Sequence, residues 1–377
     1  MIDFNGKKIM FIATTDNMIW QFLIPHINDL TAKGARVDCF CNKTGFWFDE
    51  LKNKFKLNMI EMPFRRSPFR MNNLSGYKKL KKYQKLNNYD IVYCQQPVGG
   101  MLGRLIGKNF HIPVIYIVHG FFFFKGNCFS KNLIFKTAEK FLSRYTDVLI
   151  TMTKEDYLAI KNWKVKYKYC IHGIGFDNSK YDHAPFDKSN LRQKLNLSDN
   201  DKVIVTVAEF IKRKNYPTML KCFAKLHKML PNTKYLICGT GKYFKKIKNY
   251  AIKLGLENSV IFLGYQKDIN KILQISDIML LLSKQEGLTM SIMEAMHYGL
   301  PVVTSDVRGN RDLIDDNKGG RVINIKDINM QAQALYSILT NKSLQIEMGE
   351  YNKARVKDYD ISVVKEELDQ IYNQVDL

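Results

Sequence analysis

The chain has 377 residues, too long for one ordinary hydrophobic core and suited to two domains of about 150 to 200 residues each. Hydrophobic residues make up 46% and charged residues 25%, which excludes an intrinsically disordered chain. The 58 Lys and Arg residues outnumber the 36 Asp and Glu residues, and the net charge of +22 indicates an anionic partner: nucleic acid, a phosphorylated ligand or an anionic membrane.

The N-terminal residues MIDFNGKKIMFIATT lack the long apolar segment and the cleavage site of a signal peptide, so they predict a first buried strand. The seven cysteines are scattered through apolar runs and form no C-x-x-C pair, which predicts reduced thiols, a cytoplasmic location and no metal site. The longest nearly apolar run, residues 112–124, is too short to span a bilayer. We therefore expect any membrane contact to be peripheral.

Short apolar runs alternate with longer amphipathic segments through the first half of the chain. KIMFIAT, ARVDCFCN, YDIVYCQQ and IPVIYIVHG predict strands, and WQFLIPHINDLTAKG and MLGRLIGKNF predict helices between them. This order is typical of a parallel sheet covered on both faces. A first doubly wound domain is predicted over residues 1–175.

A basic run follows the second of these strands and contains a single acid, Glu61. Residues 78–85 within this run predict a solvated helix face. Residues 121–124 are four consecutive phenylalanines, and if they are exposed they favour contact with an anionic bilayer. We expect both features on the acceptor side of the molecule. The eleven basic residues are Lys52, Lys54, Lys56, Arg65, Arg66, Arg70, Lys78, Lys79, Lys81, Lys82 and Lys85.

Residues 176–200 are polar and rich in Asn, Asp, Ser and Lys, and they predict a linker. The alternation resumes with KVIVTVAEF, KYLICGTG, SVIFLGY, DIMLLLS, PVVTS and RVINI. Residues 201–357 therefore predict a second doubly wound domain. Residues 358–377 contain a last helix, expected from about Val363 to Gln374, with no strand after it.

The stretch from Glu286 to Ile314 predicts a phosphate-binding site. A polar loop follows a buried strand and leads into a helix, and ligands of open α/β sheets bind where strands end at helix N-termini. Backbone amides of the first helical turn have no intrahelical acceptor, so a diphosphate could bind them without a metal. A helix is expected from about Ser291 to Tyr298, with Glu294 in its first turn. Glu294 and Glu286, eight positions apart, could accept hydrogen bonds from a sugar or ribose diol. The alternative is a capping box from Ser291 to Glu294.

The chain resembles the retaining glycosyltransferases of family 4 over nearly its whole length. The second half carries this resemblance in EGLTMSIMEAMHYGLPVVTSD, VAEFIKRKN, YLICGTG, VIFLGY followed by DI, and RGNRDLI. The first half carries it in YDIVYCQQPVGG, IPVIYIVHGF, LSRYTDVLIT and IHGIGFD. The resemblance implies the GT-B fold, in which two Rossmann-like domains face each other across a cleft and a C-terminal helix returns to the N-terminal domain.

By this resemblance, Glu294 would hold the ribose hydroxyls and Glu286 would contact the transferred sugar. Arg213 and Lys214 would neutralise the diphosphate leaving group, where fixed cations stabilise the transition state. Many relatives have Gly-Arg where this chain has Ala208-Glu209, so Arg213 would replace the missing cation. The phosphates would be held by backbone amides of Gly287, Leu288, Thr289 and Met290.

The remaining implied contacts come from strand ends. Gly239 and Gly241 would line the nucleotide pocket, and the base would be read by backbone atoms of Gly264 and Tyr265. His119 would reach the donor sugar from the first domain. Gln95 and Gln96 stand where relatives often have His-Thr, and their role is left open.

The resemblance is strongest to bacterial capsule and exopolysaccharide enzymes. It implies transfer of a hexose or N-acetylhexosamine, with retention, from a UDP-sugar to a lipid-linked (undecaprenyl-diphosphate type) or oligosaccharide acceptor. It also implies a cytoplasmic enzyme that binds the inner face of the membrane peripherally. No metal or other cofactor is expected. One alternative is a nucleotide-sugar epimerase of the same fold. Another is a basic nucleic-acid-binding protein, although the sequence contains no helix-turn-helix, RNP or zinc pattern.

Overall fold

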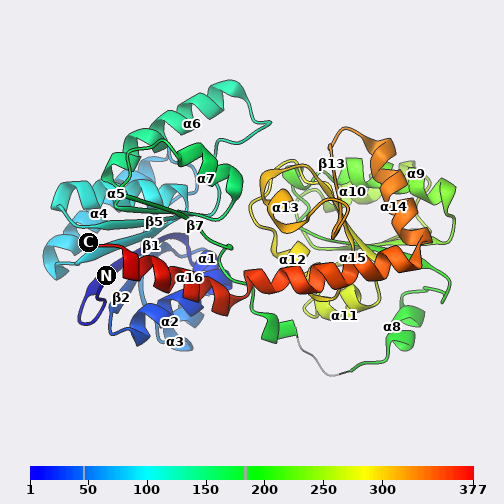
Figure 1. Ribbon diagram of the computed structural model, residues 1–377, viewed down its shortest axis with the longest axis horizontal. Coiled ribbons are helices and arrows are strands. Elements are labelled where there is room, and N and C mark those ends of the chain that lie inside the picture. Colours follow the sequence, from blue (N-terminus) through cyan, green and yellow to red (C-terminus); the bar gives the residue numbers. More distant parts are fainter. Residues whose placement is uncertain (46, 182–184) are drawn as a thin grey trace. The chain divides into compact units, whose positions relative to one another are not determined.

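A computed structural model describes residues 1–45, 47–181 and 185–377. The chain divides into two compact units, one formed by Met1–Gly175 with Ile361–Leu377 and the other by Phe176–Asp360. Each unit is a parallel sheet with helices on both faces (Figure 1). Residues 176–200, expected as a linker, group with the second unit, although 182–184 lie outside the described residues.

The first unit contains a seven-stranded sheet in the order β3-β2-β1-β4-β5-β6-β7, with every pair parallel. Its central strands are buried on both faces, which is why their sequences are continuous apolar runs. The strands are β1 (Lys8–Thr15), β2 (Arg36–Asn42), β3 (Asn58–Glu61), β4 (Ile91–Gln95), β5 (Val114–Val118), β6 (Val148–Thr151) and β7 (Tyr167–Cys170).

The helix expected after β1 is interrupted. Pro25 has no amide hydrogen, and a π turn, η1, precedes it within one continuous helical stretch. The helical segments of this unit are α1 (Asp16–Met18), η1 (Ile19–Leu23), α2 (Ile24–Ala32), α3 (Trp47–Asn53), α4 (Met71–Asn87), α5 (Pro97–Phe110), α6 (Phe129–Leu142), η2 (Ser143–Tyr145), α7 (Lys154–Ile160) and α16 (Ile361–Gln374).

The C-terminal helix α16 packs in the first unit, beside the chain's N-terminal residues (Figure 1). The hydroxyls of Tyr372 and Tyr93 lie 2.8 Å apart in the core, and the Tyr372 ring meets Phe4 edge-on at 5.0 Å. Lys33 forms an ion pair of 2.7 Å with Asp369. These contacts attach the last helix to β4, to the residue that follows α2 and to the N-terminal segment.

The second unit contains a six-stranded parallel sheet in the order β10-β9-β8-β11-β12-β13. Its strands are β8 (Lys202–Val207), β9 (Thr233–Cys238), β10 (Val260–Gly264), β11 (Ile278–Leu281), β12 (Val302–Ser305) and β13 (Gly320–Ile323). Its helical segments are η3 (Asn178–Tyr181), α8 (Lys188–Lys194), η4 (Lys212–Lys214), α9 (Tyr216–Met229), α10 (Phe244–Lys253), α11 (Ile269–Gln274), α12 (Met290–His297), α13 (Arg308–Leu313), α14 (Ile328–Thr340), α15 (Lys342–Arg355) and η5 (Val356–Tyr359).

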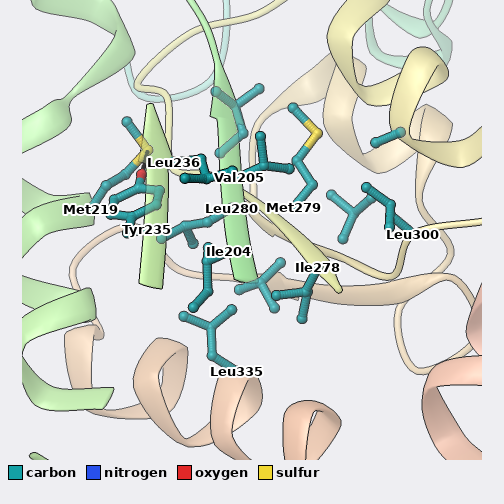
Figure 2. Close-up of a cluster of buried hydrophobic side chains, with 14 of the residues drawn as sticks. Ile204, Val205, Met219, Tyr235, Leu236, Ile278, Met279, Leu280, Leu300 and Leu335 are labelled. Carbon is teal, nitrogen blue, oxygen red and sulfur yellow. Dashed lines mark hydrogen bonds between the residues drawn. The ribbon is translucent and has the colours of Figure 1, made fainter. Parts of the chain in front are cut away.

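The core of this unit lies between the central strands and the helices on either side. Figure 2 shows side chains of β8, β9 and β11 meeting Met219 of α9 and Leu335 of α14, all of them buried. Burying one such side chain contributes about 1.5–3 kcal/mol, so these layers hold the strand ends, and the loops that follow them, in fixed positions.

The four consecutive phenylalanines do not form the exposed surface considered from the sequence. Phe121 and Phe123 are buried in the core of the first unit, where they stack on each other at 4.6 Å beside Trp163. Among the described helices, none is both long and apolar enough to cross a bilayer.

Candidate functional site

Most of the predicted site residues of the second unit lie at one edge of its sheet. Because all six strands are parallel, their carboxyl ends meet there, and the loops after β8, β9, β10, β11 and β12 are neighbours. Sheet order brings together segments that are far apart in the sequence.

Glu286, in the loop after β11, forms ion pairs with two basic side chains from the loop after β8. The Oε1 atom of Glu286 is 2.7 Å from Nζ of Lys214, and the Oε2 atom is 2.6 Å from Nη1 of Arg213. Glu286 and Lys214 are buried, whereas the Arg213 side chain is 45% exposed. Burial alone would raise the pKa of the Glu286 carboxyl, but Lys214 and Arg213 outweigh burial and lower it. The cluster therefore carries one net positive charge.

The backbone holds this cluster in place. The Lys284 amide donates to the Arg213 carbonyl at 2.7 Å, which joins the two loops directly. Asn215 adopts the left-handed conformation with φ of 56°, and its side-chain amide donates to the Leu282 carbonyl at 3.1 Å. Asparagine tolerates this conformation better than most residues, so it ends the short η4 turn and begins α9.

The RGN segment at the start of α13 supports the loop after β11. A Cβ atom on Gly309 would lie 1.8 Å from the Gly287 carbonyl oxygen, so only glycine fits there. Arg308 donates to the Glu286 carbonyl, and the Thr289 hydroxyl donates to the Asn310 side chain. The sequence assigned Arg308, Gly309 and Asn310 no role, although RGNRDLI was among the segments that carried the resemblance.

Helix α12 begins at Met290, one position earlier than expected, with Thr289 as its N-cap. No side-chain capping hydrogen bond forms there, so the capping-box alternative for Ser291 and Glu294 is wrong. The expectation that Glu294 lies in the first turn is also wrong, because it is the fifth residue of the helix. The amides of Met290 and Ser291 lie in the first turn, where intrahelical acceptors are missing.

The Glu294 carboxylate has a different environment from that of Glu286. The Tyr181 hydroxyl donates to its Oε1 atom at 2.9 Å, and the Tyr181 ring stacks on Phe176 at 4.7 Å. Burial raises the pKa of Glu294, and the Tyr181 hydrogen bond only partly offsets this. Sequence reasoning missed Tyr181, because the polar segment around it predicted only a linker.

The glycines of the CGTG segment pack on the loop after β8. Gly239 and Gly241 have φ of 140° and 147°, and a Cβ atom on Gly239 would lie 2.0 Å from the Ala208 carbonyl. The Gly239 amide donates to the Gly264 carbonyl at 2.6 Å. Tyr265, next to Gly264, is exposed. These four predicted residues therefore lie at the same sheet edge as the charged cluster.

His119 belongs to the first unit, directly after β5. Its Nε2 atom donates to Oε1 of Gln95 at 2.5 Å, which leaves Nδ1 as an acceptor. Burial lowers the pKa of His119 to about 3, so the ring is neutral at pH 7. Gln96 has a φ of 62°, and its Oε1 atom accepts a hydrogen bond from the Thr14 amide at 3.1 Å.

Two family descriptions match the chain. "Glycosyl transferase 4-like" matches residues 8–153, and "Glycosyl transferases group 1" matches residues 187–355. EpsD of Bacillus subtilis, which is named as a glycosyltransferase, is 31% identical over 97% of this chain and 96% of its own length. The chain belongs to the family 4 glycosyltransferases.

Two further similarities come from this group of enzymes. The Escherichia coli UDP-Gal:alpha-D-GlcNAc-diphosphoundecaprenol alpha-1,3-galactosyltransferase is 32% identical over 72% of this glycosyltransferase and 71% of its own length. The crystal structure of HepE from Anabaena, in complex with UDP and glucose, superposes with a TM-score of 0.80 and 18% identity, covering 98% of this chain and all of HepE. The glycosyltransferase has the GT-B fold, as the sequence predicted.

Proposed function

We propose that this glycosyltransferase moves a hexose or N-acetylhexosamine, with retention, from a UDP-sugar to a lipid-linked acceptor of the undecaprenyl-diphosphate type or to an oligosaccharide. The observation that carries the proposal is the cluster of Lys214 and Arg213 on Glu286, beside the N-terminus of α12 that also bears Glu294. The product would be a precursor of a surface polysaccharide, such as a capsule or exopolysaccharide.

The cluster suits a departing diphosphate. Lys214 and Arg213 exceed Glu286 by one positive charge, and the first-turn amides of α12 add donors and the positive end of the helix dipole. A diphosphate that gains negative charge as its bond to the sugar breaks would be stabilised most in the transition state. Because these groups neutralise the diphosphate, the proposal includes no metal ion or other cofactor.

The two glutamates would take different parts of the donor. Glu294, whose carboxylate is oriented by Tyr181, would accept hydrogen bonds from the ribose diol. Glu286, placed by two cations, would contact the transferred sugar. The base would be read by backbone atoms of Gly264 and Tyr265, beyond the end of β10.

The transfer itself exchanges one bond at the anomeric carbon for another. The acceptor hydroxyl oxygen forms a bond to that carbon, the carbon–phosphate oxygen bond breaks, and UDP leaves with the electron pair. The hydroxyl proton passes to a phosphate oxygen on the same face. The ring of His119, neutral and held by Gln95, would bind a donor-sugar hydroxyl rather than act as the base.

The names of relatives support this choice of substrates. The Escherichia coli relative is named for galactose transfer from UDP-galactose to a sugar on diphosphoundecaprenol, and HepE was crystallised with UDP and glucose. An enzyme acting on such a lipid would bind the inner face of the membrane peripherally. Helix α6 suits this contact, because it exposes Phe129, Leu133, Ile134 and Phe141 among lysines.

The experiment that tests the proposal measures UDP release from a panel of UDP- and GDP-sugars, with and without a diphosphate-linked acceptor. Acceptor-dependent UDP release with an axial product linkage supports a retaining transferase. Interconversion of the UDP-sugar without an acceptor would instead support the epimerase alternative. Lys214→Ala should lower turnover by at least about tenfold, because a hydrogen bond to a charged group contributes about 1.5–3 kcal/mol. Lys212→Ala, in the same turn but exposed, is the matched control.

A further inference from the structure

A cavity of about 350 Å³ opens in the first unit, and two arginines of the basic run, Arg65 and Arg66, are among its lining residues. It lies beyond the carboxyl ends of β1, β2 and β3, which are adjacent in the sheet. This is where open α/β sheets bind ligands, and the volume falls in the usual range for small-molecule sites, about 300–1,000 Å³. Its lining consists of Thr15, Asn17, Asn42, Thr44, Trp47, Phe64, Arg65 and Arg66.

The neutral polar groups of the cavity are held in place by the buried Asp16 carboxylate and by the pairing of β1 with β2. Asp16 is fully buried, and its carboxylate accepts hydrogen bonds from the hydroxyl and amide of Thr44 and from the amide of Asn17. Thr15 and Asn42 are paired neighbours on β1 and β2. The Asp16 charge is thus used within the protein, and the cavity presents side-chain hydroxyl and amide groups, which suit the hydroxyls of a saccharide.

One wall is aromatic. The Trp47 ring stacks on Trp20 at a centroid distance of 3.7 Å, which limits its rotation. The buried indole N–H of Trp20 has no acceptor among the described residues. A fixed indole that lines a polar cavity offers an apolar surface to the C–H face of a sugar ring.

The mouth of the cavity is cationic. Phe64 is buried in the core. The Asn73 side chain accepts the Arg65 amide at 2.8 Å and donates to the Ser67 carbonyl at 2.8 Å, so the backbone that carries the two arginines is held on both sides. Both arginines are exposed, and neither forms an ion pair with a described residue. Guanidinium groups bind phosphate oxygens bidentately, so two neighbouring arginines without an acidic partner suit a phosphate group.

We propose that this cavity binds the phosphate-bearing saccharide end of the acceptor, with the phosphate on Arg65 and Arg66 and the sugar against Trp47. This inference rests on the proposed function and deepens it, since it names the recognised chemistry: a sugar joined to a phosphate or diphosphate. The source of that group is either a lipid-linked saccharide or a soluble sugar phosphate.

The test is calorimetric titration of the full-length protein saturated with UDP, so that the donor phosphate site is closed. The probes are N-acetylglucosamine 1-phosphate, a short-chain polyprenyl-diphosphate-linked N-acetylglucosamine, inorganic pyrophosphate and methyl N-acetylglucosaminide. We expect the phosphorylated probes to bind at least tenfold more tightly than the methyl glycoside. Tighter binding of the lipid-linked probe assigns the group to a lipid, and equal binding assigns it to a soluble sugar phosphate.

The decisive comparison uses two double variants with the same change in charge. Arg65→Gln/Arg66→Gln should weaken binding of the phosphorylated probes at least tenfold, whereas Lys78→Gln/Lys82→Gln on α4 should change it less than twofold. Equal losses in both variants, or none in the first, would overturn the proposal. Trp47→Leu should weaken the saccharide probes but not pyrophosphate. Normal UDP binding by all variants would show that the donor site is intact, so failure here is separate from failure of the proposed function.

Discussion

The Nζ atom of Lys214 lies 2.7 Å from the Oε1 atom of Glu286, and both side chains are less than a tenth exposed. The carboxylate thus orients a cation that we assign to the leaving group, and does so before any donor arrives. Such preorganisation lowers the cost of arranging charges at the moment of reaction.

Replacing Glu286 with Gln should destabilise the second unit. The variant leaves Lys214 buried without its counter-charge, and breaking one side of a buried ion pair costs about 3–5 kcal/mol. Urea unfolding measures the loss, with the exposed Glu257→Gln as the matched control. A change below about 0.5 kcal/mol, the usual range for surface substitutions, would contradict the buried pair.

The two glutamates should give stability opposite dependences on pH. The pKa of Glu286 lies below its ordinary value of 4.5, so its contribution is present above pH 4.5 and is lost as pH falls through the lowered pKa. The pKa of Glu294 is raised, so its contribution is present below pH 4.5 and is lost as pH rises through the raised pKa. The free energy of unfolding should be measured at pH 4 and pH 7. Glu286→Gln should lose more stability at pH 7 than at pH 4. Glu294→Gln should gain stability at pH 7, although it binds UDP more weakly. The same sign of change in both variants would refute this assignment.

Tyr181→Phe should weaken UDP binding and raise the pKa of Glu294 further. The hydroxyl donates to the Glu294 carboxylate, and a hydrogen bond to a charged group contributes about 1.5–3 kcal/mol. UDP titration from pH 5 to 8 measures the effect, and the affinity of the variant should recover toward high pH as Glu294 ionises. Tyr250→Phe on α10 removes a hydroxyl elsewhere and should leave the profile unchanged. An identical profile for Tyr181→Phe would rule out the positioning role.

The first unit contains a buried ion pair that joins two helices. Arg104 of α5 is fully buried, 2.8 Å from the Glu139 carboxylate of α6 and 4.4 Å from the Tyr116 ring. Glu139→Ala should cost about 3–5 kcal/mol, because the guanidinium stays buried without a counter-charge. The double variant Arg104→Met/Glu139→Leu should regain most of that loss in thermal unfolding. If the double variant is no more stable than the single one, the cost comes from packing rather than charge.

Binding to anionic vesicles should depend on the exposed apolar residues of α6. Leu133→Ser removes an aliphatic side chain that is 58% exposed beside lysines and should weaken sedimentation with phosphatidylglycerol vesicles several-fold. Ile346→Ser on α15, with a similarly exposed aliphatic side chain, is the matched control. If both variants sediment with the vesicles to the same extent, α6 does not contribute to membrane binding.

Sequence alone determined the two-sheet architecture. Each buried parallel strand is a short apolar run, and Gly, Pro and polar residues mark where it begins and ends. It also identified the two glutamates of the segment from Glu286 to Ile314 as candidate site residues, because a motif of neighbouring residues can be recognised without the fold. Only the tertiary structure decided that Glu286 pairs with Lys214 and that Glu294 meets Tyr181, 113 residues away. The burial of Phe121 and Phe123 and the packing of α16 in the first unit were decided in the same way. Contacts between distant residues depend on the order of strands in each sheet, and local hydrophobic patterns do not encode that order.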